Sequence, residues 1–414
     1  MKNILLVIMV LAAALPREVR CSGYEFDGVG AAAVARGGAV IADAADWTAI
    51  YWNPANLSDV KAREAGLELK TGVMSPKDGN SLNTPVGNPF DKTRENSSFL
   101  FGSLGAAVPL DDKSALGFGL YLPLLQGSKF KDSDPTPSFY NSIDYEGFAG
   151  LAVWNLSYAR RLGERFSASA GANLIYARLE SEATHDFAVS PLLALLSMPG
   201  PDVVRQKLDG DGYGLEGVLG LKYRHSERLA FGAVFRGGSR VMLHGSATAT
   251  SQVLPAEKSD FRFKLKQPAT SGIGAAWQAR RTLKLSMDLT QTWWSGFSNK
   301  TVYETPGLLI NSNENTYDWK NSFKFRAGAV WARSESTDLL LGYAFDTPAL
   351  DKGSVDFSTA VDVPMHRLTA GLTRKWEALR GTLTAMTGYG RRTAGGVKYS
   401  LYGFALLGEA AYSF

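Results

Sequence analysis

The strongest constraint on the fold of this chain is an asymmetry in its connections. Six segments end in an aromatic residue, followed at once by a very short polar turn or by the end of the sequence. These aromatics are Tyr158, Tyr223, Trp277, Trp331, Trp376 and Phe414. The connections at the opposite ends of the segments are long. Short turns with an aromatic girdle at one end and long loops at the other are typical of a bacterial transmembrane β-barrel, whose short turns lie in the periplasm.

Period-two alternation along the segments supports transmembrane strands. Alternate residues from Phe323 to Trp331 are apolar or aromatic, whereas Lys324 and Arg326 lie between them. Successive side chains of a strand point to opposite faces, so one row would face lipid and the other the barrel interior. The same division recurs in residues 283–290 and 402–414.

Fourteen such segments can be counted, and the chain is predicted to be all-β, a 14-stranded antiparallel transmembrane β-barrel. The expected strands are residues 64–74, 97–109, 113–125, 147–160, 165–181, 211–224, 228–247, 259–277, 282–302, 317–331, 338–348, 364–376, 380–392 and 400–414. An even number places both ends of the barrel in the periplasm, and closure removes exposed edges. A soluble β-sandwich or propeller shares the polar turns, but the placement of the aromatics argues against it.

Composition agrees with a barrel. The 414 residues include 43 Gly and are 11% aromatic. No apolar run reaches the ~18–20 residues that a membrane helix needs. A net charge of +4 is too small and too scattered to indicate nucleic-acid binding. We therefore expect an outer-membrane protein without a nucleic-acid partner.

The first residues have the pattern of a secretory signal peptide. Lys2 precedes an apolar run from Ile4 to Leu15, followed by Pro16 and a polar stretch. We expect residues 1–22 to be removed, although the sequence does not fix the cleavage site. Lipidation of Cys21 is an alternative, but the preceding residues match a lipidation site poorly. As the only cysteine, Cys21 cannot form an intramolecular disulfide.

A segment of different texture separates the signal peptide from the first strand. Residues 23–62 are rich in small side chains and contain a cluster of aromatics followed by Asn53, Pro54 and Ala55. Small residues permit close packing, Asx-Pro sequences favour turns, and an aromatic cluster suits a disordered tail poorly. We expect this segment to be a hatch, or plug, inside the lumen of a barrel formed by residues 63–414.

These residues also carry a resemblance to a known family. The run from Arg36 to Asp46, followed by Tyr51-Trp52-Asn53-Pro54-Ala55, resembles the N-terminal hatch of the FadL-type outer-membrane transporters for long-chain fatty acids and aromatic hydrocarbons. Residues 288–297 and 341–348 resemble two further stretches of that family. The resemblance implies a plugged barrel that takes up apolar molecules and releases them sideways into the membrane, through a gap at a kinked third strand.

The third predicted strand is a candidate for this lateral gate. It contains Gly117, Gly119 and Pro123. Glycine weakens strand packing and proline cannot donate a hydrogen bond to a neighbouring strand, so a local break is plausible. The alternative is that Pro123 marks the outer end of the strand.

The connection from His185 to Leu208 is a candidate site of ligand capture. It should lie outside the cell, yet its apolar residues include Phe187, Leu192, Leu195 and Leu196. Exposed apolar surface of this extent usually marks a binding site. Alternatively, the run from Pro191 to Met198 is a short helix that closes the barrel mouth without contacting a ligand.

Basic residues that the alternation directs inward could hold a carboxylate head group. Those residues are Lys264, Lys266, Lys324 and Arg326. Pairing with lumen acids or with Asp43 and Asp46 is the stronger alternative, so we assign no carboxylate site.

Signals for an enzyme, a cofactor or a metal site are weak. Residues 28–33 match a dinucleotide fingerprint only loosely, because no strand precedes them. The histidines lack the spacing of metal ligands; they are His185, His225, His244 and His366. We expect no catalytic residue, metal or cofactor. A barrel hydrolase with a Ser and a His on neighbouring strands is the remaining enzyme hypothesis.

The leading functional hypothesis is passive transport of hydrophobic small molecules by a monomer in outer-membrane lipid. One alternative is a surface shuttle or assembly protein for secreted cargo. Another is a hydrophilic porin, against which the expected plug argues. The sequence does not identify the ligand or fix the oligomeric state.

Overall fold

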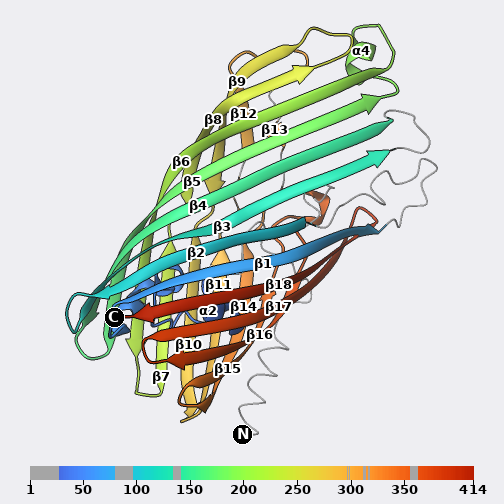
Figure 1. The fold of residues 1–414 in the computed structure, drawn as a ribbon. Helices are drawn as coiled ribbons and strands as arrows, with labels where there is room; N and C mark the ends of the chain where they lie inside the picture. The colour runs from blue at the N-terminus through green and yellow to red at the C-terminus, as the bar shows by residue number, and fades with distance from the viewer. Residues whose placement is uncertain are drawn as a thin grey trace.

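A computed structural model of the chain describes residues 28–79, 97–133, 141–295, 297, 299–310, 314–315, 318–354 and 362–414. The expected signal peptide, with Cys21, lies outside these residues. In the described part, antiparallel strands form one 18-stranded sheet. The last strand pairs with the first from Glu64↔Ser413 to Gly79↔Lys398, so the sheet closes on itself (Figure 1). The all-β barrel prediction is therefore confirmed.

The strands are β1 (Glu64–Gly79), β2 (Ser97–Pro109), β3 (Ser114–Ser133), β4 (Ser142–Leu162), β5 (Phe166–Phe187), β6 (Asp202–Arg224), β7 (Leu229–Arg236), β8 (Ser239–Thr250), β9 (Glu257–Gln267), β10 (Thr270–Arg280), β11 (Leu283–Thr292), β12 (Asn299–Tyr303), β13 (Glu314–Asn315), β14 (Ser322–Ser334), β15 (Thr337–Asp346), β16 (Met365–Trp376), β17 (Leu379–Ala394) and β18 (Val397–Ser413). The short helices are α2 (Ala31–Ala35), α3 (Ala49–Trp52), η1 (Pro54–Asp59), α4 (Pro191–Leu195) and η2 (Lys352–Ser354). No helix in the described residues is long and apolar enough to cross a membrane.

Three of the predicted strands are interrupted at one level of the wall. Breaks separate β7 from β8, β9 from β10, and β11 from β12. β6 bridges the first break, because it pairs with β7 through residues 218–224 and with β8 through residues 205–213. Counting each interrupted pair once, and the two-residue β13 together with β14, gives the predicted ring of 14 strands.

Two bands of aromatics mark the lipid-facing part of the wall. At the short-turn end, Trp277, Trp331 and Trp376 are exposed. At the other end, Tyr176 and Tyr213 lie with ring centroids 5.1 Å apart. The outward row of β6 between the bands is apolar, and Leu215 is 72% exposed. Aromatic belts of this kind lie at the two interfaces of a bilayer.

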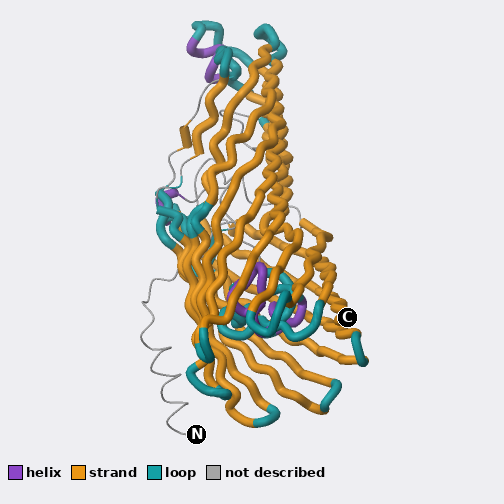
Figure 2. The backbone as a smooth tube through the Cα atoms, turned by 90° about the vertical axis from the view of Figure 1, so that its left-hand side faces the viewer, coloured by secondary structure: helices purple, strands orange, loops and turns teal. Residues whose placement is uncertain are grey.

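Strands β3 to β6, β8, β9 and β12 continue beyond the outer aromatic band as a tall curved sheet (Figures 1 and 2). Its outward face is charged and carries cross-strand ion pairs, such as Arg178 with Asp209 at 3.4 Å and Arg262 with Glu304 at 3.0 Å. Charged rows do not face hydrocarbon. This upper sheet therefore stands outside the bilayer.

The upper sheet explains where the sequence prediction of strand ends was wrong. The predicted strands 165–181 and 211–224 extend to Phe187 and begin at Asp202. Much of the expected loop between them is therefore strand. An apolar outward row in the sequence indicates contact with lipid. This pattern ends where the outward row leaves the membrane, although the hydrogen-bonded strand continues beyond that point.

A change of phase explains a second wrong expectation. On β9 the inward residues have odd numbers, such as Phe261 and Phe263, whereas on β10 they have even numbers, such as Thr270. The break at residues 268–269 shifts the alternation by one residue. Lys264 is therefore exposed on the outward face rather than directed into the lumen.

The N-terminal segment (residues 28–60) lies among the lower strands, where its short helices are visible in purple in Figure 2. Most of its residues are buried, and Trp47, Asn53 and Leu57 are 0% exposed. Backbone groups of α2 accept hydrogen bonds from Thr369 Oγ1 (2.9 Å) and Thr384 Oγ1 (2.7 Å) on the inner face of β16 and β17.

Glycines on the inner wall permit this close approach. A Cβ atom on Gly342 would lie 1.9 Å from the backbone nitrogen of Gly37, and one on Gly232 would lie 2.3 Å from the carbonyl oxygen of Ile41. Distances under 3.0 Å exclude a side chain where the neighbouring atom is backbone. The wall thus leaves space for the N-terminal segment.

Candidate functional site

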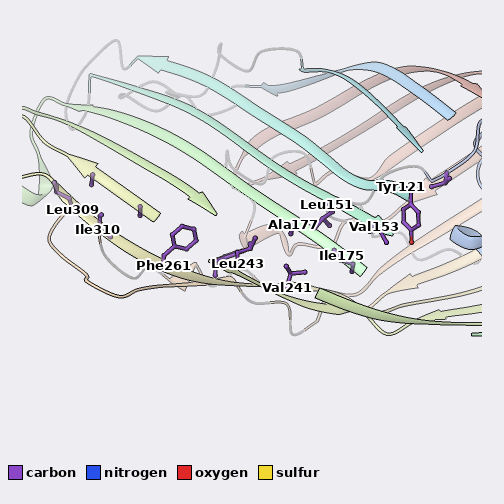
Figure 3. Close-up of a cluster of buried hydrophobic side chains, with 14 of the residues drawn as sticks. Tyr121, Leu151, Val153, Ile175, Ala177, Val241, Leu243, Phe261, Leu309 and Ile310 are labelled. Atoms are coloured by element: carbon purple, nitrogen blue, oxygen red, sulfur yellow. The ribbon is translucent and has the colours of Figure 1, made fainter. Parts of the chain in front are cut away.

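A continuous apolar surface lines the inner face of the upper and middle wall (Figure 3). We call it the inner track; its residues are Tyr121, Leu151, Val153, Ile175, Ala177, Val204, Val241, Leu243, Ala247, Ala249, Phe261, Phe263, Leu309 and Ile310. They come mainly from β4, β5, β8 and β9 and are all buried. Unlike the mixed lumen row expected from alternation, this inward row is apolar. The sequence signal is that both rows are apolar in residues 151–154, 174–177 and 241–243.

The outer end of the inner track contains part of the predicted capture site. Phe187, at the end of β5, and Leu192, in α4, are partly buried against the track. Leu195 is the last residue of α4, and Leu196 follows it with 41% exposure. Leu193, which belongs to the same apolar patch in the sequence, is buried at 2% exposure.

A carboxylate shapes the loop that adjoins this end of the track. The side chain of Glu257 accepts hydrogen bonds from the backbone nitrogens of Leu308 (2.8 Å), Leu309 (3.0 Å) and Ile310 (2.8 Å). Three N–H donors converging on one carboxylate fix the backbone of the loop. The buried side chains of Leu309 and Ile310 consequently join the track.

The inner end of the track meets polar groups and the N-terminal segment. Tyr121 packs edge-on against Tyr51, with ring centroids 5.2 Å apart. Nearby, Asn155 Nδ2 donates to Asn173 Oδ1 at 2.6 Å, and Asn173 Nδ2 donates to Glu216 Oε2 at 2.6 Å. An apolar molecule gains nothing by displacing such a buried hydrogen-bonded network. On β3 to β9 the apolar surface therefore ends at Tyr121, and the same cluster continues into the N-terminal segment through Tyr51, Trp47 and Val29.

The pairing of β3 changes at the same residue. Among the described residues, β3 pairs with β2 only from Ala115 to Leu120. Its pairing with β4 shifts register between Tyr121 and Leu124, so Pro123 lies in the irregular stretch. Gly117 and Gly119 lie lower, in the paired stretch, where they face the side chain of Ile50. These two glycines make room for the N-terminal segment.

Asn53, Pro54 and Ala55 form the start of η1. The Asn53 side chain accepts a hydrogen bond from the backbone nitrogen of Ala55 at 3.1 Å and donates to the carbonyl oxygens of Ile41 (2.8 Å) and Leu221 (3.0 Å). Pro54 occupies the first turn of the helix, where its missing N–H removes no bond. One side chain thus joins two parts of the N-terminal segment to β6.

Asp59 holds the end of the N-terminal segment to the wall. Its carboxylate contacts Lys222 Nζ at 2.6 Å, Arg224 Nη2 at 2.7 Å and Arg161 Nη2 at 3.2 Å. Burial acts to raise the pKa of Asp59, but Lys222 and the two arginines outweigh it and hold this pKa below its usual value. Asp59 therefore stays ionised at neutral pH.

Two further groups of charges hold the segment. Asp43 contacts Arg36 at 2.8 Å and Lys284 at 3.1 Å. Arg380, on β17, contacts Asp46 at 3.2 Å and Glu409 at 3.4 Å. Asp43 and Asp46 are the two acids that the sequence offered as partners for basic residues of the lumen. The wall bases that they contact, Lys284 and Arg380, are not the ones predicted.

Two of the predicted inward bases are indeed directed inward, and one of them contacts the segment. Lys324 and Arg326 are 3% and 6% exposed. The guanidinium of Arg326 lies 5.5 Å from the ring centroid of Trp52. Within the described ranges, no three His, Cys, Asp or Glu side chains are grouped so that they could hold a metal ion.

Solved structures share this fold. A Pseudomonas aeruginosa FadL homologue superposes with a TM-score of 0.76 at 16% identity, covering 95% of this chain and all of the other (100%). The Pseudomonas putida toluene transporter TodX gives 0.71 at 15% identity, with 94% and 99% covered. The Ralstonia pickettii toluene transporter TbuX gives 0.70 at 17% identity, with 94% and 99% covered.

The sequence comparison assigns the family. A search of curated proteins found no significant match. The family model described as outer membrane protein transport protein (OMPP1/FadL/TodX) matches residues 21–377. This match spans the N-terminal segment and most of the barrel, so the chain belongs to this family and is an outer-membrane transport protein rather than an enzyme.

Proposed function

We propose that this protein takes up hydrophobic small molecules from outside the cell and releases them sideways into the outer membrane. The ligand class would be long-chain fatty acids or aromatic or aliphatic hydrocarbons. Two similar structures are described as toluene transporters, and the inner track offers an apolar surface of matching chemistry.

The observation that carries this proposal is that Tyr121 belongs both to the inner track and to the irregular stretch of β3. It is the innermost wall residue of the inner track and also the first residue of β3 beyond the described pairing with β2. A molecule that follows the track therefore arrives where β3 has no described backbone pairing with β2. Pro123 supports a break there, because it has no N–H to donate.

The N-terminal segment supports sideways release. We propose that residues 23–62 act as a hatch within a barrel of residues 63–414, after removal of a signal peptide of residues 1–22. Charges hold the described part of the segment to β4, β6, β11 and β17. A segment held at so many points obstructs the direct path to the periplasm, whereas each CH₂ group that moves from water into lipid gains ~0.8 kcal/mol.

Bridging the proposed exit tests the route. In a Cys21→Ser background, Leu100→Cys places one thiol on β2 and Leu122→Cys places another on β3, next to the stretch where these two strands have no described pairing. A short bismaleimide would join the two thiols across that stretch. We expect the bridged protein to lose uptake of radiolabelled fatty acid or toluene in reconstituted vesicles. The matched control is Val108→Cys with Leu116→Cys, a pair that is already in register. Bridging the control should leave uptake unchanged.

Two results would contradict the proposal. Undiminished uptake through the bridged Leu100–Leu122 variant would exclude an exit between β2 and β3. Large, stable conductance in planar bilayers without uptake of apolar ligands would indicate a hydrophilic porin. The surface-shuttle hypothesis predicts instead that deletion of the protein removes secreted cargo from the cell surface.

A further inference from the structure

The short-turn end of the barrel carries exposed arginines that form no salt bridge with the described residues. We call them the rim arginines: Arg160, Arg165, Arg228, Arg280, Arg281 and Arg333. They lie at or beside the turns that follow β4, β6, β10 and β14. All six are exposed, and none forms a salt bridge with another residue in the described ranges.

Exposed arginines at the opposite end of the molecule behave differently. On the upper sheet, Arg178 contacts Asp209 at 3.4 Å, Arg205 contacts Glu182 at 3.8 Å, and Arg262 contacts Glu304 at 3.0 Å. The chain thus neutralises these arginines itself. At the short-turn end, Glu164, Glu227 and Glu335 lie in the same turns as rim arginines. Within the described residues they form no salt bridge with them, which leaves the rim guanidinium groups available to an external anion.

The position of the rim arginines relates them to the membrane. Arg160 follows Tyr158 by two residues on β4, so both side chains lie on the lipid-facing row. Two residues span about 7 Å of strand, which is roughly 5 Å of depth in a strand tilted by about 45°. Aromatic side chains lie at the head-group boundary, and long basic side chains reach outward from it. The guanidinium consequently reaches the depth of lipid phosphates.

We propose that the rim arginines bind anionic phospholipids of the inner leaflet of the outer membrane. Guanidinium groups match phosphate oxygens with paired hydrogen bonds. The rim arginines come from turns spaced along the ring, next to the aromatic band. Lipids that surround the wall fit this distribution. For a soluble acidic partner we would instead expect the arginines to form one compact patch that faces the periplasm.

Lipid selectivity of two matched triple variants tests the proposal. The rim triple is Arg280→Gln, Arg281→Gln and Arg333→Gln; the control triple on the upper sheet is Arg178→Gln, Arg205→Gln and Arg262→Gln. Both remove three positive charges from exposed positions. Each protein is reconstituted in phosphatidylcholine, and spin-labelled phosphatidylglycerol and phosphatidylcholine report which lipid occupies the shell around the barrel. Heat-modified migration on gels checks that each barrel is folded.

We expect the wild type and the control triple to prefer phosphatidylglycerol severalfold, and the rim triple, which keeps three of the six rim arginines, to show about half of that preference. The wild-type preference should fall as salt is added, because exposed charges are screened. A wild-type ratio near one overturns the proposal, and so does an equal loss in both triples. An undiminished preference in the rim triple also overturns it, and would leave a soluble polyanion as the partner of this end.

Discussion

At the scale of single residues, the N-terminal segment is held by a few side chains with several bonds each. Asn53 is completely buried and makes three hydrogen bonds, two of them to backbone carbonyls in different elements. Asp59 is surrounded by Lys222, Arg224 and Arg161. Because a buried charge that loses its partner is costly, these bases make the Asp59 carboxylate a strong anchor.

The pH dependence of the Asp59 anchor follows from its lowered pKa. A carboxyl group whose folded pKa lies below its unfolded value stabilises the folded state above the unfolded pKa, and that contribution is lost as the pH falls through the folded pKa. With a reference value of 3.8 and a downward shift, the contribution should be constant from pH 8 to about pH 5 and fall below about pH 4.

Asp59→Asn isolates this effect, because asparagine keeps the shape and loses the charge. We expect the variant to have a lower Tm than the wild type, by a difference that is constant above pH 5 and shrinks below pH 4. Thermal unfolding in detergent, followed by circular dichroism across this pH range, measures the difference. A difference that grows toward low pH would contradict the expected sign.

At the scale of elements, alternation predicts strands well where one face contacts lipid. The outward rows of β14 and β18 were predicted residue by residue, because lipid admits only apolar side chains there. The same signal fails in the upper sheet, where both faces meet water or protein. It also fails across the break at residues 268–269, since one extra residue reverses every side chain that follows.

The contacts of the N-terminal segment lie beyond such reasoning. The Asn-Pro-Ala stretch could be recognised, but the carbonyl group of Leu221, to which Asn53 donates, is separated from it by 168 residues. The glycines that accommodate the segment look like ordinary strand glycines in the sequence. Only the closed ring shows that Gly342 faces Gly37 whereas Gly408 faces a Leu383 side chain at ordinary contact distance.

Those two glycines give a matched test. A Cβ atom at Gly342 would meet the Gly37 nitrogen at 1.9 Å, whereas one at Gly408 has its nearest neighbour, a flexible Leu383 side chain, at 3.8 Å. We expect Gly342→Ala to displace the N-terminal segment and to accelerate hydrogen exchange in residues 31–41. Gly408→Ala should leave exchange unchanged. Equal exchange in both variants would mean that the segment does not rely on this approach.

At the scale of the whole molecule, the two aromatic bands define how much of the protein lies in lipid. Between Tyr213 and Tyr223 on β6 the outward row is apolar, and above it the row becomes charged with Asp211 and Asp209. About ten residues of strand at ~3.3 Å each, tilted by about 45°, span roughly 23 Å. The molecule therefore suits a thin bilayer, and its upper sheet stands in water.

This dimension predicts how stability depends on lipid length. In phosphatidylcholine vesicles of increasing acyl length, we expect the highest Tm in bilayers with a hydrocarbon thickness near 23 Å and a steady fall in thicker ones, because mismatch must be relieved by tilting or by deforming the bilayer. A Tm that keeps rising toward thick bilayers would show that part of the upper sheet is immersed in lipid.

The order of the chain and the closure of the sheet together restrict how the molecule can be assembled. The N-terminal segment is synthesised before every strand, yet α2 bonds to Thr384, 353 residues later, and Ala32 bonds to Glu409, 377 residues later. Contacts between such distant residues form late and slowly. The last strands of the wall thus form part of the site that holds the first described residues, so the segment can reach its final position only once the end of the chain is in place.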